Sequence, residues 1–113
     1  MASPLLPLNQ FINIAKKITT TDQVVYTVPS GISSIVLSAI CSNYTINSVV
    51  VDVSLLKGGI YYKLIPTIGL TGNEVMDVIS GRMVLVEGDQ LVVKSNTANS
   101  VDFIMSLNEA ANE

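Results

Sequence analysis

The chain has 113 residues, a length typical of a single domain that buries one hydrophobic core without disulfides or a structural metal. Hydrophobic residues make up 49% of the chain and charged residues 13%, which is the opposite of the balance found in disordered proteins and excludes that class. The net charge is −3 and the six cations are scattered, so there is no basic stripe and we expect no nucleic-acid partner.

Residues 1–17 predict an extended arm in front of the folded domain. Pro4 and Pro7 disfavour helix at the residues before them. These prolines, and the lack of a basic start, argue against a secretory signal. The chain contains no uninterrupted apolar run of ~20 residues, so we also expect no membrane partner.

The arm carries more apolar side chains than a free tail would leave in water. We predict that it binds another protein through Leu5, Leu6, Leu8, Phe11, Ile12 and Ile14. The alternative is that the arm folds back over its own domain and covers the edge of a sheet. In both cases an extended conformation is expected, because the β-branched run 19–21 follows directly.

Residues 22–43 predict a β-hairpin. The residues of 23–28 alternate in the period-2 pattern of a strand with two unlike faces, Pro29 and Gly31 then form a corner, and a second alternating run follows. In that second run we expect the core-facing side chains to be Ile35, Leu37, Ala39 and Cys41. Cys41 is the only cysteine, so it has no intramolecular disulfide partner and is expected to behave as a small buried hydrophobe.

Strand-like runs separated by turn residues then recur about every ten residues. The Gly58-Gly59 pair predicts a hairpin turn, Pro66 predicts an edge strand or a strand end, and 69–73 predicts a loop. The expected strands of this part are 48–57, 60–66, 75–79, 83–86, 91–95 and 101–107.

Together these patterns predict an all-β fold, an antiparallel β-sandwich that is jelly-roll-like and has about eight short strands. A small barrel is the alternative architecture. We expect the sandwich domain to span 18–109, between the arm at 1–17 and a polar tail at 110–113.

Several apolar residues fall on the strand faces opposite the inferred core. Either the predicted register slips at β-bulges, or these residues form an interface between subunits. They are Val36, Ile40, Val50, Leu56, Val92 and Ile104.

No catalytic or metal-binding constellation is visible. The chain has no histidine, which excludes a Ser-His-Asp triad and a histidine metal site, and we expect no enzyme activity and no cofactor. A carboxylate pair, a calcium turn or a tyrosine-lined carbohydrate groove is each less well supported than ordinary turn and packing roles. The residues concerned are Asp52, Asp77, Glu87, Asp89, Tyr44, Tyr61 and Tyr62.

Three segments carry a resemblance to a known class of proteins. They are ITTTDQVVYTVPSGISSIVLSAICSN (18–43), LLKGGIYYKL (55–64) and MVLVEGDQLVVKSNTANSVDFIMSLNE (83–109). These segments resemble those of small β-sandwich virion proteins from tailed bacteriophages. The shared features are the Thr-rich lead with its Val-Tyr-Thr-Val-Pro corner, the Gly-Gly hairpin with paired tyrosines, and the Gly-Asp turn before the final strands. These motifs consist of turn residues and strand-forming residues, not catalytic residues.

The resemblance implies a non-enzymatic structural protein located in the virion. A capsid decoration or cement protein is the first expectation, and a tail, baseplate or fibre-base adaptor is the alternative. A carbohydrate-binding β-sandwich module remains as a third, minor alternative. The partners that we expect are other copies of the chain, in a homo-oligomer such as a trimer, and the major capsid protein or tail proteins.

Overall fold

The computed structural model describes residues 9–79 and 81–112, which form nine β-strands and no helix. The strands are β1 (Asn9–Lys17), β2 (Gln23–Thr27), β3 (Ile32–Asn43), β4 (Val49–Lys57), β5 (Ile60–Leu70), β6 (Val75–Asp77), β7 (Met83–Leu85), β8 (Gln90–Ser95) and β9 (Val101–Ala111). In this part of the chain no helix is long and apolar enough to cross a membrane.

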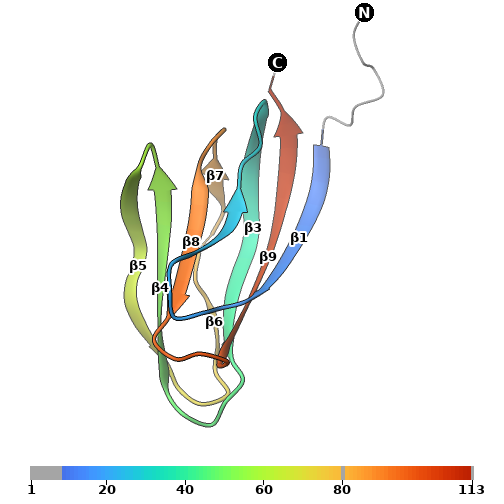
Figure 1. Cartoon of the computed structure of the whole chain (residues 1–113). Helices are drawn as coiled ribbons and strands as arrows, with labels where there is room; N and C mark the ends of the chain where they lie inside the picture. The colour runs from blue at the N-terminus through green and yellow to red at the C-terminus, as the bar shows by residue number, and fades with distance from the viewer. Residues whose placement is uncertain (1–8, 80, 113) are drawn as a thin grey trace, which may run out of the picture.

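The strands form two antiparallel sheets that face each other (Figure 1). One sheet has the order β1-β9-β3-β6, and β7 also pairs with β3; the other has the order β2-β8-β4-β5. Because β6 and β7 pair with the two ends of β3, they act as two pieces of one broken strand. The result is a jelly-roll-like sandwich of a five-stranded and a four-stranded sheet, which confirms the predicted all-β sandwich.

The predicted hairpin over 22–43 is wrong in one respect. β2 pairs with β8 in one sheet, whereas β3 pairs with β9 in the other. The Pro29–Gly31 corner therefore carries the chain across the sandwich, and the Glu87 side chain accepts a hydrogen bond from the Gly31 N–H at 2.7 Å. Alternation could not separate the two cases, since strands in facing sheets and strands in one hairpin both turn an apolar face to the core.

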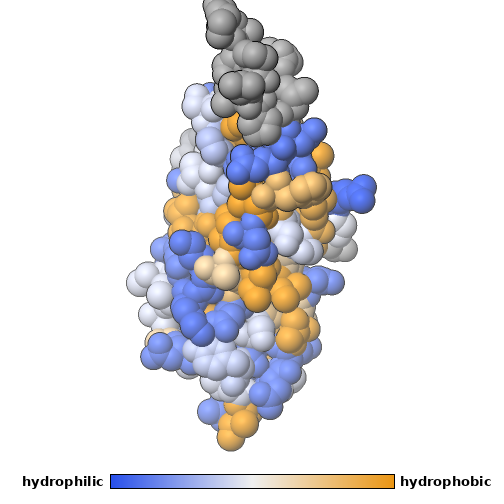
Figure 2. Space-filling view, turned by 90° about the vertical axis from the view of Figure 1, so that its right-hand side faces the viewer, coloured by the Kyte–Doolittle hydropathy of each residue, from blue (hydrophilic) through white to orange (hydrophobic). Residues whose placement is uncertain are grey.

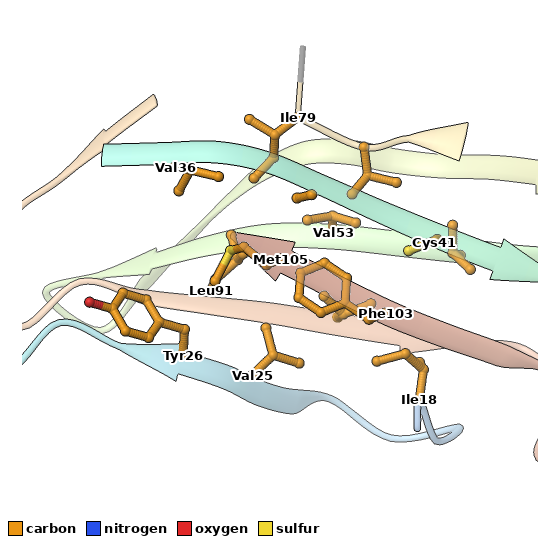
Figure 3. Packing of buried hydrophobic residues seen from close by; sticks show 14 of the residues in the cluster. Ile18, Val25, Tyr26, Val36, Cys41, Val53, Ile79, Leu91, Phe103 and Met105 are labelled. Atoms are coloured by element: carbon orange, nitrogen blue, oxygen red, sulfur yellow. The ribbon is translucent and has the colours of Figure 1, made fainter. Parts of the chain in front are cut away.

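The core between the sheets confirms the predicted register of β9 (Figure 3). Val101, Phe103, Met105 and Leu107 are all buried. β3 differs from expectation because a bulge between Val36 and Ser38 shifts its register. Ala39 and Cys41 point inward as predicted, but before the bulge Val36 is buried, while Ile35 and Leu37 are 41% and 40% exposed.

β4 and β5 form the predicted hairpin, but β5 continues to Leu70, so the loop expected at 69–73 begins later. Pro66 does not end the strand because β5 lies at the edge of its sheet, where a missing N–H need not break a ladder. The register with β4 shifts at this point, and the Thr67 hydroxyl donates a hydrogen bond to Asp52 on β4.

Both flanking segments contribute residues to the sandwich. Residues Asn9–Lys17 of the expected arm form β1, which pairs with β9 along its whole length. At the other end, β9 runs on to Ala111 and pairs there with Ile32. Residues 1–8 of the arm lie outside the described residues.

Candidate interaction surface

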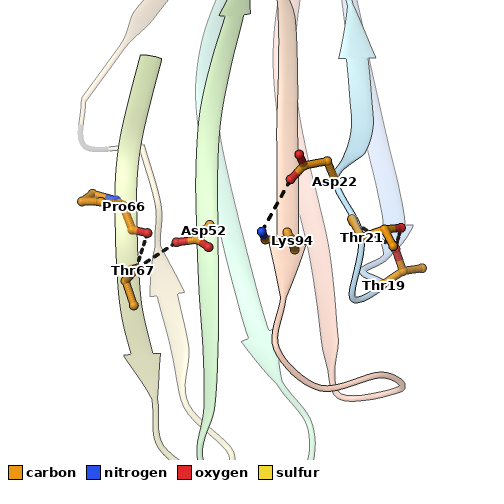
Figure 4. Close-up of polar contacts among 7 residues, drawn as sticks. All are labelled: Thr19, Thr21, Asp22, Asp52, Pro66, Thr67 and Lys94. Atoms are coloured by element: carbon orange, nitrogen blue, oxygen red, sulfur yellow. Dashed lines mark hydrogen bonds and ion pairs between the residues drawn. The ribbon is translucent and has the colours of Figure 1, made fainter. Parts of the chain in front are cut away.

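The outer face of the β2-β8-β4-β5 sheet carries a row of charged side chains, beside apolar ones such as Val24 and Tyr61. Asp52 on β4 lies opposite Lys94 on β8, and Lys94 forms a 3.9 Å ion pair with Asp22 at the start of β2 (Figure 4). Thr67 on β5 extends this polar row through its 3.2 Å hydrogen bond to Asp52. Water solvates such a row well, so this part of the face is suited to permanent exposure.

The outer face of the β1-β9-β3-β6/β7 sheet carries exposed apolar side chains among mostly uncharged polar ones, and we call it the apolar face. Its side chains come from all strands of the sheet, and the most exposed are Phe11 at 78% and Val84 at 63%. Its apolar members are Phe11, Ala15, Ile35, Leu37, Ile40, Val75, Val84 and Ile104.

Strand register aligns these side chains in rows. Phe11 and Ile35 both pair with Asn108, and Ile35 also pairs with Val84, so one row crosses four strands, with the uncharged Asn108 between Phe11 and Ile35. Ala15, Ile104 and Ile40 form a second row. Uncharged Asn13 and Ser106 lie between the rows. Figure 2 looks at the molecule from the β1 side and shows a hydrophobic band running down the middle between hydrophilic flanks.

One end of the apolar face is closed by an ion pair. The Lys17 ammonium lies 2.8 Å from Asp102 and 4.7 Å from the centre of the Tyr44 ring. Its hydrogen bond to Asp102 raises the pKa of Lys17, so the lysine stays charged across the physiological range. Apart from this pair, Asp77 is the one charged residue among the described residues of the face.

A shallow hollow of about 200 Å³ lies where β1 and β9 run side by side. It forms beside Ala15, whose methyl group leaves space between longer neighbours. The hollow is lined by Ala15, Lys16, Lys17, Asp102, Phe103 and Ile104.

The predicted partner-binding residues are divided between two environments. Phe11 lies on the apolar face, whereas Ile12 and Ile14 are half-buried and pack against the core of their own sandwich. Leu5, Leu6 and Leu8 lie outside the described residues. The partner-binding role of this set stays a prediction.

Only some residues of the apolar face could be placed on an outer strand face from the sequence. Ile40 and Ile104 were expected on an outer face and lie there. Val36 was expected outside but is buried, because the bulge in β3 exchanges it with Ile35. Val92 does point outward, on the charged sheet, yet it is buried among its neighbours there. The outward position of Val84 could not be predicted, because β7 is too short to show an alternating pattern.

The residues considered for chemistry have structural roles or lie apart. Both carboxylate oxygens of Asp89 are used, one by Lys57 at 2.7 Å and one by the Val86 N–H at 2.9 Å. Tyr44 follows β3 at one end of the sandwich, whereas Tyr61 and Tyr62 lie near the β4–β5 turn at the other end (Figure 1). Within 9–79 and 81–112, no group of three potential metal ligands occurs.

The sequence matches no protein-family model and no curated protein. Among solved structures, the chain is similar to a protein of Bacillus endospore appendages, which are described as disulfide-linked pili. The two share 11% sequence identity and a TM-score of 0.57, and the alignment covers 93% of this chain and 88% of the appendage protein. It is also similar to a protein of the icosahedral IBDV particle, with 10% identity over 97% of this chain but only 34% of that one and a TM-score of 0.53.

A pentameric capsid protein from metagenomic phage sequences aligns with 16% identity over 88% of this chain and 62% of that one, with a TM-score of 0.44. At these identities the first two likenesses show a shared fold. The proteins that share it with this chain are structural subunits of a pilus and of a virus particle.

Proposed function

We propose that this protein is a non-enzymatic structural subunit of a virus particle, namely a decoration or cement protein on the capsid of a tailed bacteriophage. The observation that carries the proposal is the difference between the two outer sheet faces. One face presents Phe11, Ile35 and Val84 in a row, and the other presents the Asp22–Lys94–Asp52 row. A domain of this kind is suited to burying one face against a neighbour while the other stays in water.

Two further observations support the proposal. The jelly roll is an architecture used by capsid proteins, and the IBDV particle protein shares it. The turn motifs of 18–43, 55–64 and 83–109 resemble those of phage virion proteins, and each has a structural role here. The Pro29–Gly31 corner connects the two sheets, and Gly58 and Gly59 adopt positive φ in the β4–β5 turn. Asp89 accepts a hydrogen bond that stabilises the turn before β8.

A second candidate is a subunit of a filamentous appendage, such as a phage tail. The likeness to the endospore appendage protein favours it. Any such filament would not use the cysteine of this chain for disulfide links, because Cys41 is fully buried and burial raises the pKa of its thiol to about 12.

The test is whether recombinant protein binds purified particles through the apolar face. Phage particles are stripped of loosely held proteins, incubated with the protein and sedimented. We expect the wild type to sediment with them and Ile35→Asp to bind at least about tenfold more weakly, because a charge would be buried at the contact. The matched control is Lys63→Ala, on exposed β5 of the other sheet, which should bind like the wild type.

Wild-type protein that stays in the supernatant, or equal losses for the two variants, would contradict the proposal. Binding confined to isolated tails would favour the second candidate.

A further inference from the structure

Among the described residues no strand pairs with the outer edge of β1, which we call its free edge, and this edge differs from the other sheet edges. β2 has five residues and a register shift, β5 contains Pro66, and β6 and β7 have three residues each, all features that discourage pairing with another chain. β1 has nine residues, no proline and no register shift against β9. Its cations, Lys16 and Lys17, are confined to one end. A long regular edge of this kind is a template for another strand.

The backbone groups that face this free edge can be identified. The Ile18 N–H donates to the Val101 carbonyl at 2.9 Å, in line with the β1–β9 register. Antiparallel ladders alternate, so the even residues of β1 form the hydrogen-bonded pairs with β9. The N–H and C=O groups of Phe11, Asn13 and Ala15 therefore point away from β9.

We propose that two copies of this chain pair through β1, antiparallel, about a two-fold axis at Asn13. In this register Asn13 faces Asn13 of the second copy, and Phe11 faces Ala15 of the second copy. Each of these pairs is hydrogen-bonded, because the odd residues carry the free backbone groups. The two sheets become one continuous sheet, and the contact is isologous, as in most dimers.

The side chains are complementary in this register. Phe11, 78% exposed, meets the one small apolar residue of the strand, Ala15, beside the hollow of about 200 Å³. The symmetry repeats this contact on both sides of the axis. Charge also fits, since Lys16 and Lys17 face Gln10 and Asn9 and no like charges meet. Ile12 faces Ile14 on the inner side and extends the core across the contact.

The inference goes beyond the proposed function, because the dimer forms from the purified chain alone and its failure leaves particle binding untouched. A pairwise contact also differs from the trimer that the sequence favoured. It is tested by cross-linking at the axis. Cα atoms are about 5.5 Å apart in a hydrogen-bonded pair, so the Cα separation at Asn13→Cys lies within the range that a disulfide spans. Phe11→Cys is the register control, because its equivalent lies about 13 Å away along the strand.

We expect mild oxidation to convert Asn13→Cys to a covalent dimer at least about tenfold faster than Phe11→Cys. Cys41 does not compete, because it is buried. Equal rates, or faster cross-linking of Phe11→Cys, would refute the register. Sedimentation of the unmodified protein provides the second measurement: a wild type that stays monomeric at all concentrations would refute the dimer itself.

Two further variants separate the contact from folding. Phe11→Ser should weaken the dimer about tenfold or more, because it removes the side chain that fills the hollow. Ile46→Ser is the matched control, since Ile46 is even more exposed, at 84%, but lies in the loop after β3. Equal weakening by both variants would contradict the assigned surface.

Discussion

Phe103, near the start of β9, is the largest fully buried side chain among the residues that the structure describes (Figure 3). Phe103→Ala should cost about 3–5 kcal/mol, because it loses the burial of the ring and leaves a cavity. A domain of this size holds about 5–15 kcal/mol, so the variant should be close to unfolding. Denaturant titration measures the difference.

The neighbouring residue is the control for this prediction. Ile104 is 40% exposed on the apolar face, so Ile104→Ala should change the free energy of unfolding far less than Phe103→Ala. Similar losses at the two positions would show that β9 has a different register.

Tyr26 joins the two sheets through its hydroxyl group. The hydroxyl lies 2.6 Å from the Ser34 hydroxyl on β3 and donates a 2.6 Å hydrogen bond to Glu109 on β9. Burial, together with the hydrogen bond to Glu109, raises the pKa of Tyr26 from 10.0 to about 12. The folded protein therefore favours the neutral phenol.

This shift predicts a loss of stability in alkali. The unfolded chain releases the Tyr26 proton near pH 10, whereas the folded chain retains it until about pH 12, so unfolding becomes more favourable across this window. Urea midpoints measured from pH 8 to pH 12 should fall less steeply for Tyr26→Phe than for the wild type. The buried Cys41 thiol contributes a loss of the same sign in both proteins. Identical slopes would rule out a raised pKa at Tyr26.

The loop after β3 and the loop after β5 pack closely against each other at the end of the sandwich that contains Asn43. The buried amide of Asn43 donates to the carbonyls of Asn47, Leu70 and Thr71 and so ties the loop after β3 to the loop after β5. Gly72 lies against the backbone of Ile46, which leaves no room for a side chain.

Gly72→Ala should destabilise the protein by about 1–3 kcal/mol, since its Cβ atom would lie 2.4 Å from the Ile46 carbonyl oxygen and the loops must shift. Gly69→Ala is the matched control, because a Cβ atom there meets nothing within 4 Å. Thermal unfolding compares the two. If Gly69→Ala proved the more damaging, the close packing of these loops would be refuted.

Much of the fold could be predicted because alternation locates strands well. All the expected strands exist, and the pattern of β9 gave the correct core residues. The alternation of apolar and polar residues does not show which strands pair. The sequence therefore predicted β2 and β3 as one hairpin, although they lie in facing sheets. It also fails at bulges, where one extra residue exchanges Ile35 for Val36. The apolar face could not be assembled from sequence for the same reasons, because it depends on both pairing and the bulge.

At the scale of the whole molecule, the two outer faces have opposite character. The Asp22–Lys94–Asp52 row suits a surface that faces water, whereas the apolar face presents apolar side chains from all five strands of the other sheet. An apolar face that spans a whole sheet is larger than scattered surface hydrophobes and is typical of an interface. We therefore expect this face to be buried in an assembly.

A density map of the assembled particle tests this burial. We expect repeated copies of the jelly roll in the map, with the apolar face against a neighbouring subunit and Lys94 and Asp52 toward solvent. A map in which the chain is absent, or in which Phe11, Ile35 and Val84 face solvent, would contradict it.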